Sequence, residues 1–356
     1  MSNPFKFGSV VEGGHFTDRA EETEKVREVL ASSNHLVIIS PRRFGKTSMV
    51  LKAVGDMGRP VVYLDLLAVT SVPDFAAQLL RRVLAENKWE SVKRAVASFR
   101  IVPRVELNPV SGGVDVSFLP AALEDFTPLE DVLGLIEKTS KARNRAIVIL
   151  DEFQQVAQLG KSLPGKLRAA MQHHKNVNYV FLGSAESMMR DIFQSKKSPF
   201  YHFGFLMHLP VIPREDFFGF LDGKFRKVTK EHEALSNKIL DYTECHPYNT
   251  QMLAYYCYAL LEKRKYGAGA VDAAVEEIVR THANDYERLW NTIRNTDKRI
   301  LVALATGAPV SSVAQPTSTL YSGLGRLADQ GFLIKTGTYV FDDPFFKQWI
   351  VAVLLA

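Results

Sequence analysis

The segment Ser40–Thr47 combines a tight loop with a lysine and a hydroxyl in an order suited to phosphate binding. The apolar run Leu36–Ile39 before it predicts a short buried strand, and Gly45-Lys46-Thr47 predicts the first turn of a helix. In such a loop the backbone N–H groups point at the anion, Lys46 reaches the β- and γ-phosphates, and Thr47 can ligate Mg²⁺. Ser40 stands where the pattern G-x-x-x-x-G-K-[ST] has glycine. The match therefore needs support from elsewhere in the chain.

Two adjacent acids, Asp151 and Glu152, end the apolar strand predicted at Ala146–Leu150. A carboxylate at this tip, beside a phosphate loop, can hold Mg²⁺ through its water shell, and its neighbour can polarise the attacking water. The alternative is an exposed acidic turn after a core strand. The order of the two motifs along the chain favours the functional interpretation.

Ser184 follows another predicted strand, Tyr179–Leu182. Its hydroxyl could hydrogen-bond the γ-phosphate or the attacking water. From the residues alone, an ordinary Gly-Ser turn or the N-cap of the helix beginning at Ala185 explains it equally well.

Apolar strands alternating with helical segments position these motifs. This alternation of strands and helices is typical of a parallel α/β sheet buried on both faces. The segment Phe16–Leu30 predicts a helix capped by Thr17 or Asp18. Within Ile101–Phe118 two alternating runs flank Asn108–Gly112, which predicts a β-hairpin inserted between the second and third core strands. That hairpin would suit a partner surface or a capped sheet edge. The predicted core strands are Leu36–Ile39, Val61–Leu66, Ala146–Leu150, Tyr179–Leu182 and Phe205–Leu209.

The chain becomes helical from about Arg214, and its last part predicts a winged helix-turn-helix. Three domains follow: nucleotide-binding (1–212), helical lid (213–284) and winged helix (285–356). The predicted wing is the hairpin Phe332–Phe341. The predicted helices are Glu215–Arg226, Glu233–Thr243, Thr250–Arg264, Val271–Asn291, Asp297–Leu304 and Leu320–Gln330.

Composition gives weaker constraints. The 356 residues are 46% hydrophobic, with 44 basic and 39 acidic side chains and a formal charge of +5, which is compatible with nucleotide or nucleic-acid partners. Cys245 and Cys257 lack the spacing of a zinc site or a disulfide framework, so a reducing cytoplasm is the simplest location. The apolar runs are strand-length, and neither a signal peptide nor a membrane span is predicted.

These motifs, taken together, resemble the archaeal-type ATPase family, a branch of the AAA+ and STAND proteins with a P-loop NTPase sheet. The resemblance runs through nearly the whole chain. It is carried by Phe16–Glu22, a Walker A segment at Ser40–Ser48, a Walker B strand at Ile147–Glu152, Leu182–Ser184, the lid turn His246–Tyr248 and the tail motif Asp343–Trp349.

The resemblance implies ATP or ADP and Mg²⁺ as ligands. Lys46 would bind phosphate, Thr47 and Asp151 would hold Mg²⁺, Glu152 would be the catalytic base and Ser184 the first sensor. The remaining nucleotide-binding residues that it implies are Asp18, Arg19, Ser40, Pro41, Arg42, Arg43, Phe44, Gly45, Ser48 and Pro247.

Two departures from the family pattern have structural consequences. A positive φ at Ser40 would be strained, which leaves loop shape and turnover rate open. Cys245 stands where a small, glycine-like residue is common before the lid turn. No arginine finger can be assigned, because Arg190 and Arg214 also fit ordinary surface charges.

The predicted recognition helix is poorly equipped for DNA. Its exposed face offers Arg326 beside Asp329, with Tyr321 and Ser322, and Lys335 is the only basic residue of the wing. Bidentate base reading and phosphate neutralisation need more cationic groups. The face therefore favours an unidentified protein partner.

The sequence thus predicts a cytoplasmic, Mg²⁺-dependent ATPase that acts as a nucleotide-driven switch, with oligomerisation left open. The alternatives are a non-hydrolysing nucleotide-bound scaffold and a DNA-binding regulator.

Overall fold

A computed structural model describes residues 3–9, 13–17, 19–86, 96–97, 99–107, 114–119, 122, 125–263, 267 and 269–354. Asp18 and the predicted turn Asn108–Gly112 lie outside the described residues. The chain divides into two compact units. The sheet unit comprises residues 20–40 and 46–209, and the helical unit comprises 1–19, 41–45 and 210–356.

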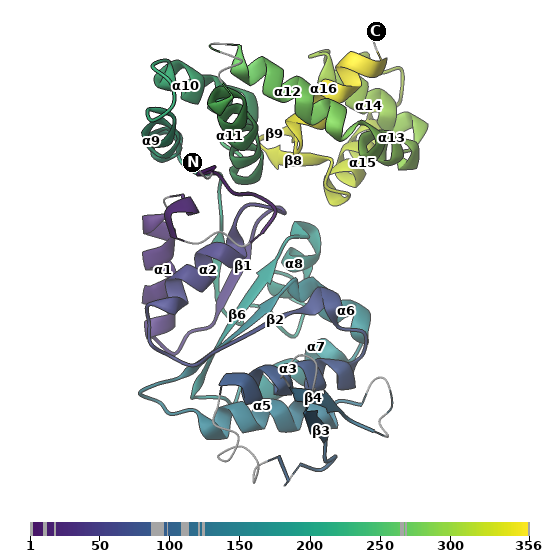
Figure 1. The fold of residues 1–356 in the computed structure, drawn as a ribbon. Coiled ribbons are helices and arrows are strands. Elements are labelled where there is room, and N and C mark those ends of the chain that lie inside the picture. The colour runs from purple at the N-terminus through teal and green to yellow at the C-terminus, as the bar shows by residue number, and fades with distance from the viewer. Residues whose placement is uncertain are drawn as a thin grey trace. The chain divides into compact units, whose positions relative to one another are not determined.

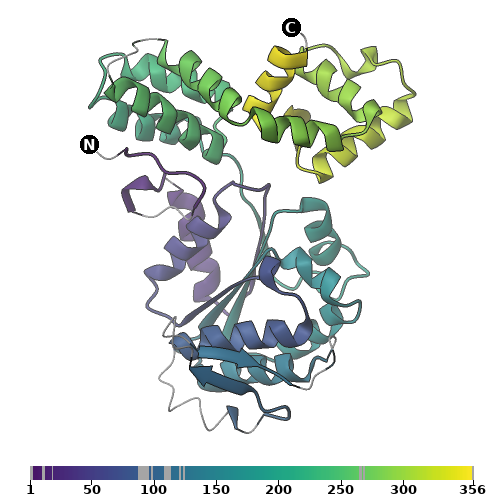
Figure 2. The same cartoon turned by 45° about the vertical axis from the view of Figure 1, so that its right-hand side comes forward.

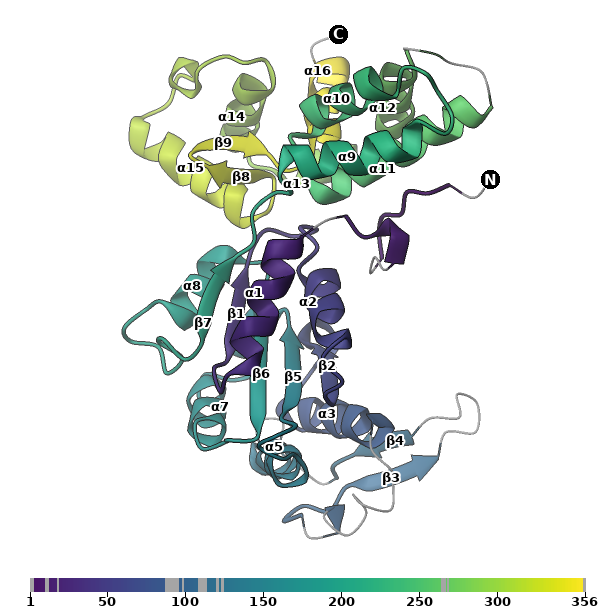
Figure 3. The same cartoon turned by 90° about the vertical axis from the view of Figure 1, so that its left-hand side faces the viewer.

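The sheet unit contains five parallel strands in the order β2-β5-β6-β1-β7, of which β1, β2 and β6 are labelled in Figure 1 and all five in Figure 3. All five predicted core strands are confirmed. Their bounds are β1 Leu36–Ile39, β2 Val61–Asp65, β5 Ala146–Asp151, β6 Val177–Gly183 and β7 Phe205–His208. Because the strands run parallel, the loop after β1, the acids after β5 and Ser184 after β6 all leave the same edge of the sheet.

Helices cover both faces of this sheet. Helix α1 packs against α2 and β1, whereas α3 packs against α5 and α5 against α7 (Figure 3). The three central strands are buried along their whole length, as a parallel sheet covered on two sides requires. The helices are α1 Ala20–Ala31, α2 Lys46–Gly55, α3 Val72–Glu86, α5 Thr127–Thr139, α6 Val156–Leu159, α7 Leu163–Met171 and α8 Glu186–Phe193, with short 3₁₀ turns η2 Leu66–Ala68 and η3 Phe153–Gln155.

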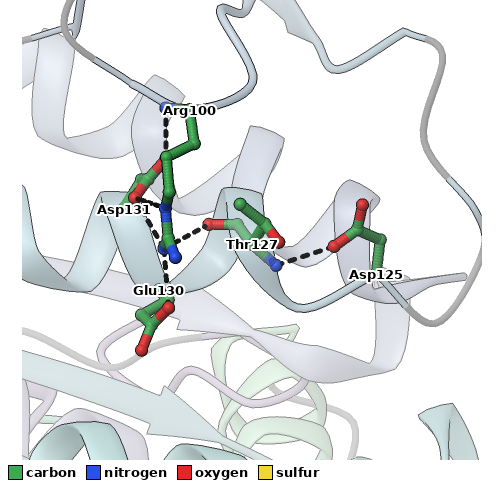
Figure 4. A network of polar contacts seen from close by, with 5 residues as sticks. All are labelled: Arg100, Asp125, Thr127, Glu130 and Asp131. Carbon is green, nitrogen blue, oxygen red and sulfur yellow. Dashed lines mark hydrogen bonds and ion pairs between the residues drawn. The ribbon is translucent and has the colours of Figure 1, made fainter.

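The predicted hairpin is confirmed as β3 Arg104–Leu107 paired antiparallel with β4 Val114–Ser117. It lies beside α3 (Figure 2). The chain entering it is fixed by Arg100, which donates from its backbone and guanidinium to Asp131 and pairs with Glu130 at 2.6 Å (Figure 4). These contacts raise the pKa of Arg100. Asp125 accepts the Thr127 N–H at 2.9 Å at the start of α5, which lowers the pKa of Asp125.

The helical unit is built from α9 to α16 and a second hairpin. The predicted helix Val271–Asn291 is wrong as a single element, because His282 interrupts it and α12 and α13 follow one another. The bounds are η1 Gly13–His15, α9 Arg214–Phe225, α10 His232–Thr243, α11 Pro247–Glu262, α12 Ala270–Thr281, α13 Ala283–Thr292, α14 Asn295–Ala305, η4 Val310–Ser312, α15 Thr317–Asp329, β8 Leu333–Thr336, β9 Thr338–Phe341 and α16 Pro344–Leu354.

The N-terminal segment is part of the helical unit. Phe5 is buried, with its ring centroid 5.0 Å from Phe225 and 6.0 Å from Tyr258. Gln251 of α11 accepts the Lys6 N–H and donates to the carbonyl of His15 at 3.0 Å. Aromatic packing and one amide therefore bind this segment to α9 and α11.

No helix among the described residues is long and apolar enough to cross a membrane.

Candidate nucleotide site

The loop between β1 and α2 has the backbone that a phosphate cradle needs. Gly45 has φ +84°, a left-handed conformation that glycine adopts without strain, and it directly precedes the first residue of α2. Ser40 is not among the positive-φ residues, so the strain that a positive φ would cause at this position does not arise. The left-handed residue without glycine's freedom is Arg43, at φ 64°. Serine is tolerated at position 40 because the turn is made further along the loop.

Lys46 begins α2 and is buried, although it carries an ammonium group. Its Nζ donates to the backbone carbonyl of Ser40 at 3.0 Å. A buried ammonium is costly unless polar partners satisfy it. Its placement at the N-terminus of α2 is where an anion would be bound.

Thr47 and Asp151 form the second part of the site. The Thr47 hydroxyl donates to Oδ2 of Asp151 at 2.6 Å, joining the start of α2 to the end of β5. A hydroxyl and a carboxylate oxygen are hard oxygen donors of the kind that Mg²⁺ prefers, usually with water completing its shell. These two residues therefore fit the predicted metal.

Glu152 stands directly after β5 in a left-handed backbone conformation, with φ 50° and ψ 46°. Ser184 donates to its Oε2 at 2.6 Å, and the Gln154 amide donates to the same oxygen. The helix after Ser184 begins at Glu186 and has no side-chain cap, so the N-cap interpretation of Ser184 is wrong. The structure thus brings Glu152 and Ser184 together, as the shared sheet edge predicts.

Two residues that contact or adjoin Asp151 were not predicted from the sequence as part of the site. Tyr63 of β2 donates to Oδ2 of Asp151 at 3.1 Å; burial and the Asp151 charge raise the pKa of its phenol. Asp65 is paired with Asp151 in the sheet register, and burial raises its pKa, with the charges of Asp151 and Glu152 adding to the effect. Both belong to a predicted strand, Tyr63 in the middle of β2 and Asp65 at its end, but only the strand order places β2 beside β5.

In the helical unit, the loop residues contact the start of α11. The ring of Phe44 meets that of His246 edge-on at 4.9 Å, and the Arg43 guanidinium lies over the Tyr248 ring at 4.4 Å. Arg19 is buried and donates to the carbonyls of Phe44 at 3.1 Å and Pro210 at 2.9 Å. In this structure Arg19 therefore fixes the loop backbone.

The other predicted residues lie at the start of α11, in the loop before α2 and in the first turn of α2. Pro247 is the first residue of α11, and His246 caps that helix by accepting the Asn249 N–H. Pro41 and Ser48 are half-buried, and Arg42 is exposed. Cys245 has φ 58°, which explains why a glycine-like residue is common at that position.

The two arginines considered as fingers are engaged elsewhere. Arg190 pairs with Glu186 at 3.4 Å within α8, and Arg214 pairs with Asp241 at 2.7 Å in the helical unit. Both are about half exposed, as ordinary surface charges are.

A parallel sheet with a Gly-Lys-Thr loop after one strand and an Asp-Glu pair after another is the architecture of P-loop ATPases. Comparison with known proteins supports this assignment to the P-loop ATPases. The family described as an ATPase domain predominantly from Archaea matches residues 16–253. The chain belongs to this family, and with it to the nucleotide-binding ATPases.

Solved structures share the fold across the chain. A Walker-type ATPase of Pyrococcus abyssi has a TM-score of 0.67 and 18% identity, with 94% of this chain and 96% of that chain covered. The ORC2 protein of Aeropyrum pernix, in ADPNP–ADP complexes, has a TM-score of 0.56 and 16% identity, with 99% and 100% covered. No curated protein sequence matches the chain.

Proposed function

We propose that this chain is a Mg²⁺-dependent ATP hydrolase that acts as a nucleotide-driven switch for a macromolecular partner. The observation that carries the proposal is the pair of hydrogen bonds at the sheet edge, Thr47 to Asp151 and Ser184 to Glu152, both 2.6 Å. They place two oxygens suited to Mg²⁺, from Thr47 and Asp151, beside an oriented Glu152 carboxylate at the end of β5.

In the proposed reaction, Lys46 and the loop N–H groups bind the β- and γ-phosphates. A Mg²⁺ ion held by Thr47 and Asp151 would neutralise phosphate charge. Glu152 takes a proton from water as the water oxygen attacks the γ-phosphorus in line and the bond to ADP breaks. Ser184 has one O–H to donate, and as the first sensor it would give it to the Glu152 carboxylate or to the γ-phosphate. Asp18 and Arg19 belong to the segment proposed beside the adenine, with Pro247 near the base.

The switch role is supported by contacts within the helical unit. Arg43 and Phe44 of the phosphate loop rest on Tyr248 and His246 at the start of α11. Asn249 of the same turn donates to the carbonyl of Asp342 at 2.8 Å, two residues before α16. A change in loop conformation on phosphate binding would therefore reach the C-terminal helices through packed side chains.

We also propose a winged helix at residues 285–356 after a lid at 213–284, supported by the order α14, α15 and hairpin β8–β9. The boundary at 284 falls within α13 and that at 212 just before α9. A cytoplasmic location is proposed because Cys245 and Cys257 are both free.

The scaffold alternative was favoured by Ser40 and by the lack of an assignable arginine finger. The structure removes the first reason, because Ser40 does not have a positive φ. A chain that retains nucleotide tightly without releasing phosphate would still favour it.

The test compares Lys46→Ala and Glu152→Gln with the wild type in nucleotide affinity and in phosphate release. Lys46→Ala should weaken ATP binding at least about tenfold, because it removes the phosphate ammonium. Glu152→Gln should keep the affinity and lose about 10²–10⁴ in turnover, the range of general-base catalysis. Lys52→Ala, an exposed lysine of the same helix, is the matched control and should change neither. Unchanged phosphate release in both site variants would refute the proposal.

A further inference from the structure

Gln154 is a buried amide directly beside the proposed base. Its side chain lies in η3 and is only 2% exposed. Its Nε2 donates to Oε2 of Glu152, the oxygen that also accepts from Ser184. A carboxylate only accepts hydrogen bonds, so the NH₂ end of the amide must face Glu152.

The other end of this amide has no donor among the described residues. Oε1 of Gln154 is buried without a hydrogen-bond partner there. A buried acceptor left in this way costs stability, whereas an apolar side chain of similar size does not. The neighbours Phe153 and Val156 belong to the hydrophobic core, so the surroundings suit an apolar residue. The one contribution of the amide that an apolar side chain could not make is its hydrogen bond to Glu152.

Glu152 needs more than one restraint. Its backbone is left-handed, and its side chain has three rotatable bonds. Ser184 approaches from the end of β6 and Gln154 from η3, so the two donors reach one oxygen from different elements. With Oε2 held from two sides, the orientation of the carboxylate is fixed, and Oε1 of Glu152 would be the oxygen that takes the proton. General-base catalysis depends on such fixed geometry.

We propose that Gln154 is a positioning residue of the ATPase reaction, which holds the Glu152 carboxylate in its reactive orientation at a cost in stability. This inference rests on the proposed function, because it needs Glu152 to act as the base. If Gln154 were only structural, replacing its amide would lower Tm, and any loss of turnover would follow from that loss of stability.

The experiment measures kcat, KM for ATP and Tm of the full-length Gln154→Met variant. Methionine has similar length and flexibility but cannot donate to Glu152. We expect kcat to fall about tenfold or more with KM nearly unchanged, and Tm to stay equal or rise because the unpartnered acceptor is gone. Gln155→Met, the same substitution at the neighbouring half-buried position, is the control and should keep wild-type kcat. Wild-type kcat in Gln154→Met would overturn the proposal, and so would a fall in kcat that only follows a lower Tm.

A second variant tests the shared oxygen. Ser184→Ala and Gln154→Met act on the same carboxylate, so their effects on kcat should be non-additive in the double variant. Strictly multiplicative losses would contradict a common action through Glu152.

A wild-type chain without turnover would refute the proposed function, and the contact itself can then be tested without activity. In that case Gln154→Met should change Tm differently in the wild-type background and in a Glu152→Met background. Equal Tm changes in the two backgrounds would show that the contact is absent and would overturn the inference separately.

Discussion

Asp151 is the most constrained side chain of the candidate site. Its Oδ2 accepts from Thr47 at 2.6 Å and from Tyr63 at 3.1 Å, and its Oδ1 accepts the Glu152 N–H at 2.9 Å. The three donors come from α2, β2 and the chain directly after β5. Of these donors, Tyr63 is not itself a proposed metal ligand. Outer partners of this kind fix the orientation of a ligand, and their loss typically weakens metal affinity about 10–100-fold.

Tyr63→Phe removes one of these donors without changing the ring. We expect the Mg²⁺ concentration for half-maximal phosphate release to rise about tenfold, because Asp151 loses the hydrogen bond that orients it. The measurement is a Mg²⁺ titration at saturating ATP. Tyr321→Phe, at an exposed tyrosine of α15, is the control. An unchanged Mg²⁺ requirement in Tyr63→Phe would show that the phenol does not support the metal site.

At this scale, the sequence predicts the residues whose motifs have fixed spacing and misses those defined by tertiary neighbours. Thr47 meets Asp151, and Ser184 meets Glu152, as the common sheet edge requires. Tyr63 could not be found, because nothing in one sequence shows that β2 pairs with β5. The left-handed backbone of Glu152 was equally hidden, since it arises from how the chain leaves the strand.

Among the elements, β1 depends on a neutral histidine at its start. His35 accepts the Tyr179 N–H at 3.2 Å, and its ring lies 4.6 Å from that of Phe203. Burial, with smaller contributions from Arg168 and His174, lowers the pKa of His35 from 6.5 to about 4. The folded state therefore binds fewer protons at this position than the unfolded state between these two pH values.

The sheet unit should lose stability as the pH falls from 6.5 towards 4. Because the folded pKa is lowered, the contribution of His35 is fully present above pH 6.5 and decreases by up to about 1.4 kcal/mol per pH unit below it. His35→Asn keeps an acceptor for Tyr179 but does not titrate, so its free energy of unfolding should depend less on pH. Urea unfolding at several pH values measures this, with exposed His202→Asn as the control. Parallel curves for wild type and His35→Asn would exclude His35 as the cause.

Most of the strands and helices follow from sequence patterns, but the predicted helix Val271–Asn291 is divided in two and α16 was not predicted as a helix. Continuous apolar runs mark the strands because both faces of the sheet are covered. The break at His282 was missed because the apolar pattern continues across it. The new helix lets Tyr286 donate to Asp343 at 3.1 Å, a tertiary contact that no local pattern encodes.

For the whole molecule, the C-terminal helices make DNA binding through α15 unfavourable. The sequence places Arg326 on the exposed face, but the structure pairs it with buried Asp297, at 2.7 Å from Nη2 and 3.2 Å from Nε. The exposed side chain of α15 that remains prominent is Tyr321. Because Arg326 is the only basic residue of α15 and is paired, this helix offers little positive charge to a phosphate backbone.

DNA affinity measured at several salt concentrations tests this view. We expect weak binding with a slope of log K against log salt near zero, because a protein that neutralises Z phosphates shows a slope of about −0.9Z. A steep negative slope that is lost in an Arg326→Ala variant would support the DNA-binding regulator instead.

The central claim is that the sheet edge hydrolyses ATP with Glu152 as the base, and phosphate release under single-turnover conditions tests it most directly. Wild-type chain in excess over ATP should release phosphate with Mg²⁺ and stop when the metal is chelated. Glu152→Gln should bind the same ATP and release phosphate about 10²–10⁴ times more slowly. Equal rates for wild type and Glu152→Gln, or release that continues without the metal, would contradict the account.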